Sequence, residues 1–157
     1  MTKIRDRIIL GIISGLIGGV IITLMDYIFL IKGVVITSLH EMAARIYINR
    51  KEAKTPLGKL LGVIISMGFS VGGGLVMTEL LTRSGKENLI AKGIFTGVTS
   101  GAIIPALLSG LNKNKIKAKN ASTHLFYSLA HAVYGIVVIL CCVKLGHPSL
   151  FDESPPN

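Results

Sequence analysis

The sequence has no tryptophan, only two cysteines and few charged residues for its length. Charged residues occupy 16% of the 157 positions, whereas a soluble domain usually carries about a quarter. The cysteines are neighbours, Cys141 and Cys142. Adjacent side chains on a helix point about 100° apart, which excludes an ordinary disulfide and a C-x-x-C pair. The H-E-x-x-H and P-loop motifs are also missing. We therefore predict that the protein is not an enzyme and uses neither a metal nor another cofactor.

Acidic residues are scarce as well: 8 Asp and Glu stand against 17 Lys and Arg, which gives a formal net charge of +9. Basic residues interleaved with aromatics would indicate nucleic acid, but here they lie between apolar blocks, where they would meet anionic lipid headgroups. Half of the residues are hydrophobic, and the mean hydropathy is +0.64. We predict one integral membrane domain whose partner is the lipid bilayer, with no nucleic acid. The candidates for interfacial anchors are Tyr27, Tyr47, Tyr127 and Tyr134.

The apolar run at residues 8–31 organises the rest of the chain. It holds a single charged residue, Asp26. At about 1.5 Å per residue, a helix of this length crosses the roughly 30 Å hydrocarbon core of a bilayer. Gly11, Gly15 and Gly19 recur every four residues and so line one side of the helix. A side without side chains lets another helix approach closely, so we predict that these glycines pack against a neighbouring helix.

Further apolar runs predict an all-α membrane protein with four transmembrane helices and one interfacial amphipathic helix. Thr55 followed by Pro56 is typical of a helix start, with the threonine as N-cap and the proline at the first helical position. The prediction is a single membrane domain, residues 1–146, and a disordered tail, residues 147–157, with transmembrane helices at residues 8–31, 57–81, 89–111 and 123–145 and the interfacial helix at residues 34–48.

Small residues recur at the same four-residue spacing on the second and third predicted spans. Residues 11–25 and 93–107 share six identities in fifteen positions, and Gly73 aligns with Gly135 in a weaker match between the second and fourth spans. This pattern favours two helical hairpins in tandem, and we predict that the first and third spans contact each other through their glycine faces. Besides the glycines of the first span, the residues predicted to pack helices are Gly62, Ser66, Ser70, Gly93, Gly97 and Gly101.

Ionisable side chains inside an apolar span are costly, by about 3 kcal/mol near the bilayer centre, and therefore indicate function. His124 and His131 lie on one face of the last span, about 10 Å apart along the axis, too far to share one metal ion. The last span starts on the side where the first ends, so Asp26, His124 and the His40–Glu41 pair can meet there. We predict a polar or ion site from Asp26, His40, Glu41, His124 and His131. The alternatives are that Asp26 is an interfacial anchor and that His131 donates a hydrogen bond across the bundle.

Two short patterns resemble a known family. They are the opening glycine-rich helix followed by Asp26, and the sequence His131-x-x-Tyr134-Gly135 in the last span. Both are similar to those of small uncharacterised bacterial inner-membrane proteins of the YagU-like family. The resemblance implies a multi-pass protein of a bacterial inner membrane, and it supplies no substrate or catalytic residue. The interfacial helix and a loop with four lysines depart from the family pattern.

The distribution of basic residues predicts the orientation. One side of the predicted bundle carries seven Lys and Arg, and the other carries ten, including four lysines at residues 113–119. By the positive-inside rule the second side is cytoplasmic and both termini lie outside.

Three functions remain open from the sequence. The first is a structural or interaction bundle, working as a homo-oligomer or with a membrane protein partner. The second is a small proton- or cation-linked transporter or channel, and the third, ranked last, is a membrane enzyme that acts on lipid. The first two differ in whether Asp26 and His131 face a neighbouring backbone or a polar cavity.

Overall fold

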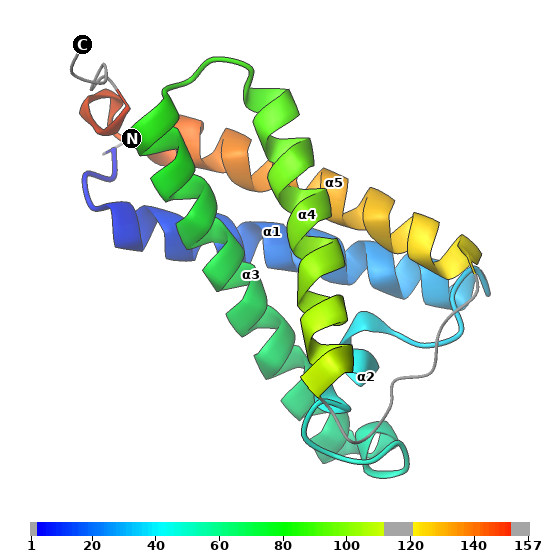
Figure 1. Ribbon diagram of the computed structural model, residues 1–157. Helices are drawn as coiled ribbons and strands as arrows, with labels where there is room; N and C mark the ends of the chain where they lie inside the picture. Colours follow the sequence, from blue (N-terminus) through cyan, green and yellow to red (C-terminus); the bar gives the residue numbers. More distant parts are fainter. Residues whose placement is uncertain (1–2, 112–120, 152–157) are drawn as a thin grey trace.

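The computed structural model of the chain describes residues 3–111 and 121–151. Within these residues the secondary structure is helical, as predicted, and one isolated bridge joins Ile4 and Gly146. The helices are α1 (Arg7–Ile31), α2 (Leu39–Ala44), α3 (Pro56–Ser84), α4 (Leu89–Leu111) and α5 (Ala121–Leu145), with short 3-10 helices η1 (Glu52–Lys54) and η2 (Pro148–Leu150). Figure 1 shows α1 and α5 running side by side, with α3 and α4 crossing them. Helices α1, α3 and α5 are long and apolar enough to cross a membrane. The lysine-rich loop lies outside the described residues.

The helix ends follow local capping chemistry. Asp6 precedes α1, and its Oδ1 accepts hydrogen bonds from the amides of Ile8 and Ile9 at 2.8 and 2.9 Å. Thr55 caps α3 as predicted, since its hydroxyl accepts from the amide of Gly58. These side chains satisfy amide groups that the first turn of a helix leaves without an intrahelical partner.

The predicted interfacial helix at residues 34–48 is shorter in the structure, where α2 begins at Leu39. The amides of Val34 and Val35 donate back to the carbonyl of Phe29, so these residues close the end of α1 and do not start a new helix. The chain reverses at Gly33, whose φ of +67° favours glycine. The sequence pattern described the apolar face of this segment and could not show that its first residues are bound to the preceding helix.

The prediction that the first and third spans meet through their glycines is wrong. The glycine stripe of α1 lies against α3: a Cβ added at Gly11 would be 2.9 Å from Leu75 Cα. The corresponding stripe of α4 lies against α5, where a Cβ added at Gly97 would be 3.1 Å from Gly135 Cα. A small-residue stripe indicates a close contact but does not name the helix that makes it.

The two contacts are built alike. A Cβ added at Gly74 of α3 would lie 2.7 Å from Gly15 Cα, and one added at Gly135 of α5 would lie 3.1 Å from Gly97 Cα. Gly74 therefore corresponds to Gly135, and the sequence alignment with Gly73 is wrong by one residue. The side of Gly73 faces the hydroxyl of Tyr134 instead.

One stripe of small residues on α3 serves two successive partners. Near the start of α3, Gly58 lies against Ala53 of η1 and Gly62 lies against the backbone of His40 in α2. Further along the same stripe, Ser70 and Gly74 lie against the glycines of α1. The segment between α1 and α3 thus folds onto the part of α3 that α1 does not cover.

The core lies where α1, α3 and α5 meet. Tyr134 of α5 crosses this core, and its hydroxyl donates to the carbonyl of Ser70 in α3 at 2.6 Å. Its ring fills the space left by Gly18 of α1. The fully buried apolar side chains of this core are Leu10, Met77, Leu81, Ala130, Val138, Ile139 and Cys142.

The two ends of the described chain are joined. The amide of Ile4 donates to the carbonyl of Leu145 at 2.9 Å, and the amide of His147 donates back to Ile4 at 2.8 Å. Phe151 is buried at the end of this segment. The predicted disordered tail therefore does not begin at His147: its first five residues are folded against the bundle, and the last six lie outside the described residues.

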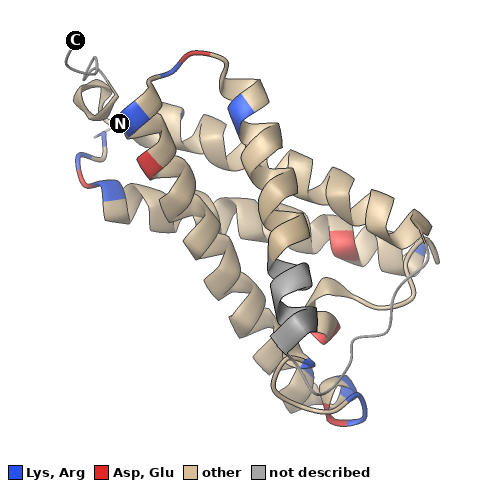
Figure 2. Cartoon of the chain, viewed as in Figure 1, with Lys and Arg blue, Asp and Glu red and all other residues tan. Residues whose placement is uncertain are grey.

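Charged residues gather at two ends of the bundle, as Figure 2 shows. We call residues 3–7, 83–92 and 144–151 the terminal end, and residues 32–59 the loop end. Between them the helices carry almost no charge, and the exception in α1 is Asp26. Charge at two ends of an apolar bundle is the distribution that a bilayer requires.

Candidate functional site at the junction of α1, α2 and α5

Asp26 is the centre of a buried polar junction. It lies near the end of α1 and is only 2% exposed. Both of its carboxylate oxygens lie 3.0 Å from the amide nitrogen of Leu39, the first residue of α2. A carboxylate at the start of a helix satisfies a free amide and interacts favourably with the helix dipole. Asp26 therefore fastens α2 to α1.

Tyr127 of α5 completes this junction. Its side chain is buried, and its hydroxyl donates a short hydrogen bond to the carbonyl of Thr37, in the turn before α2. The Oδ1 atom of Asp26 is a second, longer acceptor for the same hydroxyl, at 3.3 Å. One phenol thus ties α5 to both α1 and the segment that leads into α2.

His40 connects α2 to α3. Its Nδ1 lies 2.9 Å from the hydroxyl oxygen of Ser66, which itself donates to the carbonyl of Gly62 at 2.6 Å. Because the Ser66 hydrogen is used on Gly62, the ring Nδ1 must be the donor to Ser66. The Nε2 of a neutral His40 ring is then an acceptor.

Two polar atoms of α2 are buried without a hydrogen-bond partner among the described residues. They are Nε2 of His40 and Oε1 of Glu41. Leaving such an atom without a partner costs about 1–3 kcal/mol, a cost that ordered water removes. Both atoms sit on α2, directly after Leu39, whose amide donates to Asp26.

The two histidines of α5 belong to other surroundings. The Nδ1 of His131 lies 2.7 Å from the carbonyl of Tyr127 on its own helix, and its ring lies against Gly101 of α4. The predicted hydrogen bond across the bundle is thus replaced by one within α5. His124 is exposed. Of the five predicted site residues, the structure brings Asp26, His40 and Glu41 to one junction and places His131 in the contact between α4 and α5.

The contacts at this junction are suited to holding the helices in place. Among the described residues, no group of three or more His, Cys, Asp and Glu side chains could hold a metal ion. Asp26 faces a backbone amide and a phenol, which are groups that fix a carboxylate in place. The arrangement holds three helices and the intervening turn in register.

Three parts of this junction were not predicted from the sequence: Tyr127, Thr37 and the Leu39 amide. The tyrosines were predicted as interfacial anchors, yet Tyr127 and Tyr134 are 7% and 4% exposed. A signal for Tyr127 existed, because it shares one face of α5 with the buried Ala130 and Tyr134. A backbone amide has no signature in the sequence, so the partner of Asp26 could not be predicted.

Comparison with known proteins gives no relative. The chain matches no protein-family model, no curated protein and no solved structure. The resemblance to the YagU-like family stays an expectation that rests on Asp26 and on the sequence around His131, Tyr134 and Gly135.

Proposed function

We propose that the protein is a multi-pass inner-membrane protein in which α1, α3, α4 and α5 are four spans. Three of these helices have the length and hydropathy of a span. Helix α4 has 23 residues, which corresponds to about 34 Å at 1.5 Å per residue. Its glycine stripe packs on α5 in the same way as that of α1 packs on α3, which supports an equivalent position for it.

Within that setting we infer a structural or interaction role. This inference rests on what the polar side chains within the proposed spans contact. Asp26 accepts from the backbone amide of Leu39, and His131 lies within hydrogen-bond distance of the backbone carbonyl of Tyr127. Groups that carry ions or protons line a path through water-filled space, whereas these two are engaged by neighbouring backbone. A proton- or cation-linked transporter is the alternative.

The two roles are separated by a flux measurement. We expect purified protein in vesicles with an internal pH dye to give the same negligible proton flux for the parent and for Asp26→Asn. The amide of asparagine keeps the shape of the side chain and one acceptor oxygen but removes the charge. Empty vesicles are the control. A proton flux in the parent that Asp26→Asn abolishes would contradict the structural role and favour transport.

The crossing of α3 is tested by labelling two turns that flank it. With Cys141 and Cys142 replaced by alanine, we expect Glu87→Cys at the terminal end to react with an impermeant thiol reagent in intact cells. We expect Asn49→Cys at the loop end to react only after permeabilisation. Both positions are exposed in the fold, so differences in reactivity report the side of the membrane. Reaction of both positions from the same side would contradict a crossing by α3, and the reverse pattern would invert the orientation.

A further inference from the structure

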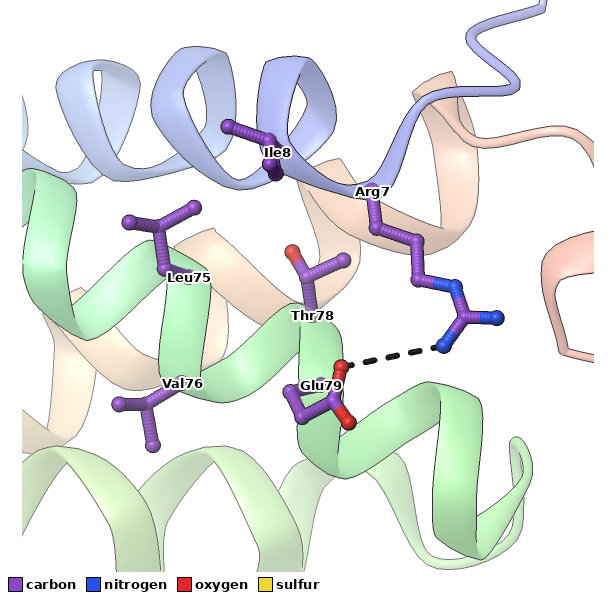
Figure 3. A pocket seen from close by; sticks show the side chains of 6 residues that line it. All are labelled: Arg7, Ile8, Leu75, Val76, Thr78 and Glu79. Carbon is purple, nitrogen blue, oxygen red and sulfur yellow. Dashed lines mark ion pairs between the residues drawn. The ribbon is translucent and has the colours of Figure 1, made fainter.

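An open groove lies at the opposite end of α1 from Asp26. It has a volume of about 420 Å³ and runs between the start of α1 and the last turns of α3, as Figure 3 shows. Its lining combines one basic and one acidic side chain at the rim with mainly apolar side chains below. The lining residues are Arg7, Ile8, Leu75, Val76, Thr78 and Glu79.

The floor of the groove is apolar and uncovered. Ile8 and Val76 are 63% and 58% exposed, although both lie on helices that belong to predicted spans. Leu75 lies between them and packs against Gly11, so the floor is continuous from α1 to α3. Such a surface is suited to a hydrocarbon chain lying along the two helices.

Arg7 stands at the rim with most of its hydrogen-bonding capacity unused among the described residues. Its Nη1 lies 3.9 Å from Oε2 of Glu79, beyond hydrogen-bond distance. The other carboxylate oxygen of Glu79 accepts from Nε of Arg83 at 2.6 Å. Glu79 is therefore neutralised chiefly by Arg83, and the three side chains together keep one positive charge beside the groove.

The surroundings of the groove are basic. The described residues of the terminal end, together with Glu79, include seven basic and three acidic side chains, all of the basic ones lying within a few residues of a helix end. The apolar run of α1 begins directly after Arg7, so in a bilayer the guanidinium would lie at the level of the lipid phosphates. The basic side chains are Lys3, Arg5, Arg7, Arg83, Lys86, Lys92 and Lys144.

The geometry points to this groove as a binding site for one anionic phospholipid. The phosphate accepts hydrogen bonds from Arg7, whose planar guanidinium matches two phosphate oxygens. One acyl chain lies over Ile8, Leu75 and Val76. The inference rests on the proposed membrane location, and the positive charge at the terminal end is what selects an anionic headgroup over a zwitterionic one.

The test is native mass spectrometry of detergent-purified protein titrated with phosphatidylglycerol, and separately with phosphatidylcholine. We expect the parent to prefer phosphatidylglycerol. We expect Arg7→Gln to weaken its binding about tenfold, the effect of losing one charge-assisted contact. The matched control is Arg5→Gln, which removes the same charge two residues away, outside the groove lining, and should change binding by less than about twofold.

A second variant tests the apolar floor without a change of charge. Val76→Phe partly fills the groove, so we expect weaker phosphatidylglycerol binding with the thermal midpoint of the parent. Val76→Phe also tests the lipid site if Arg7→Gln fails to fold. Equal losses for Arg7→Gln and Arg5→Gln, unchanged binding in Val76→Phe, or equal affinity for the two lipids would overturn the lipid site. So would competition by inorganic phosphate at the concentration of the lipid. A parent protein that does not enter membranes would instead overturn the proposed function.

Discussion

Gly74→Ala should destabilise the bundle by about 3 kcal/mol, the upper part of the range for forcing atoms into a packed contact. The added Cβ would lie 2.7 Å from both the Cα and the amide nitrogen of Gly15. These are backbone atoms of a helix and cannot turn aside, so α1 and α3 would have to separate. The core around Tyr134 would loosen as well. The Tyr134 hydroxyl donates to α3 and its ring occupies the space beside Gly18 of α1, so separation of the two helices disturbs both contacts.

The matched control lies two residues earlier on the same helix. Nothing is within 4 Å of a Cβ added at Gly72, so Gly72→Ala should be neutral or stabilise by about 0.5–1 kcal/mol through helix propensity. Thermal unfolding in detergent, followed by circular dichroism, measures both variants. Equal midpoints for Gly74→Ala and Gly72→Ala would show that the close approach of α1 and α3 is not what holds the fold.

Asp26→Ala should loosen the attachment of α2 to α1 at a cost of about 3 kcal/mol, because hydrogen bonds to a charged group contribute about 1.5–3 kcal/mol each. The Leu39 amide and the Tyr127 hydroxyl both lose an acceptor in a buried region. We expect the effect to be local, so the Leu39 amide should exchange its hydrogen faster while the amides in the middle of α5 stay protected.

The control for this prediction is Asp26→Asn. Its side-chain oxygen still accepts from the Leu39 amide, so it should retain most of the protection that alanine loses. If exchange at Leu39 is the same in the parent and in Asp26→Ala, the carboxylate does not fasten α2 and the interpretation of this junction fails.

The helices were predictable from the sequence because the length of an apolar run and its capping residues are local properties. The runs around Asp26 and after Thr55 gave α1 and α3 to within a few residues. The partners of those helices were not predictable, because Gly11 and Gly93 carry the same information about close approach and neither indicates a direction. Only the fold shows that Gly11 faces α3 and that Gly93 faces α5.

The candidate site was likewise predictable from the sequence only in part. Asp26 stood out because a charge in an apolar run is costly, and that reasoning needs no structure. Its partners are an amide thirteen residues later and a phenol on α5 whose residue type alone predicts an interfacial anchor. Long-range hydrogen bonds of this kind depend on where the turn after Gly33 places α2, which no spacing rule describes.

The hydrogen bonds between Ile4 and the end of α5 constrain the order in which the bundle can form during synthesis. Ile4 is translated before α1, yet its backbone partners, Leu145 and His147, are translated only after most of α5. Helices α1 and α3 can pair early through Gly15 and Gly74. The space between them that Tyr134 fills stays open until α5 has been translated. In a nascent chain the segment before α1 therefore lacks these backbone partners until α5 has been translated, so the bundle can close only after α5 has been made.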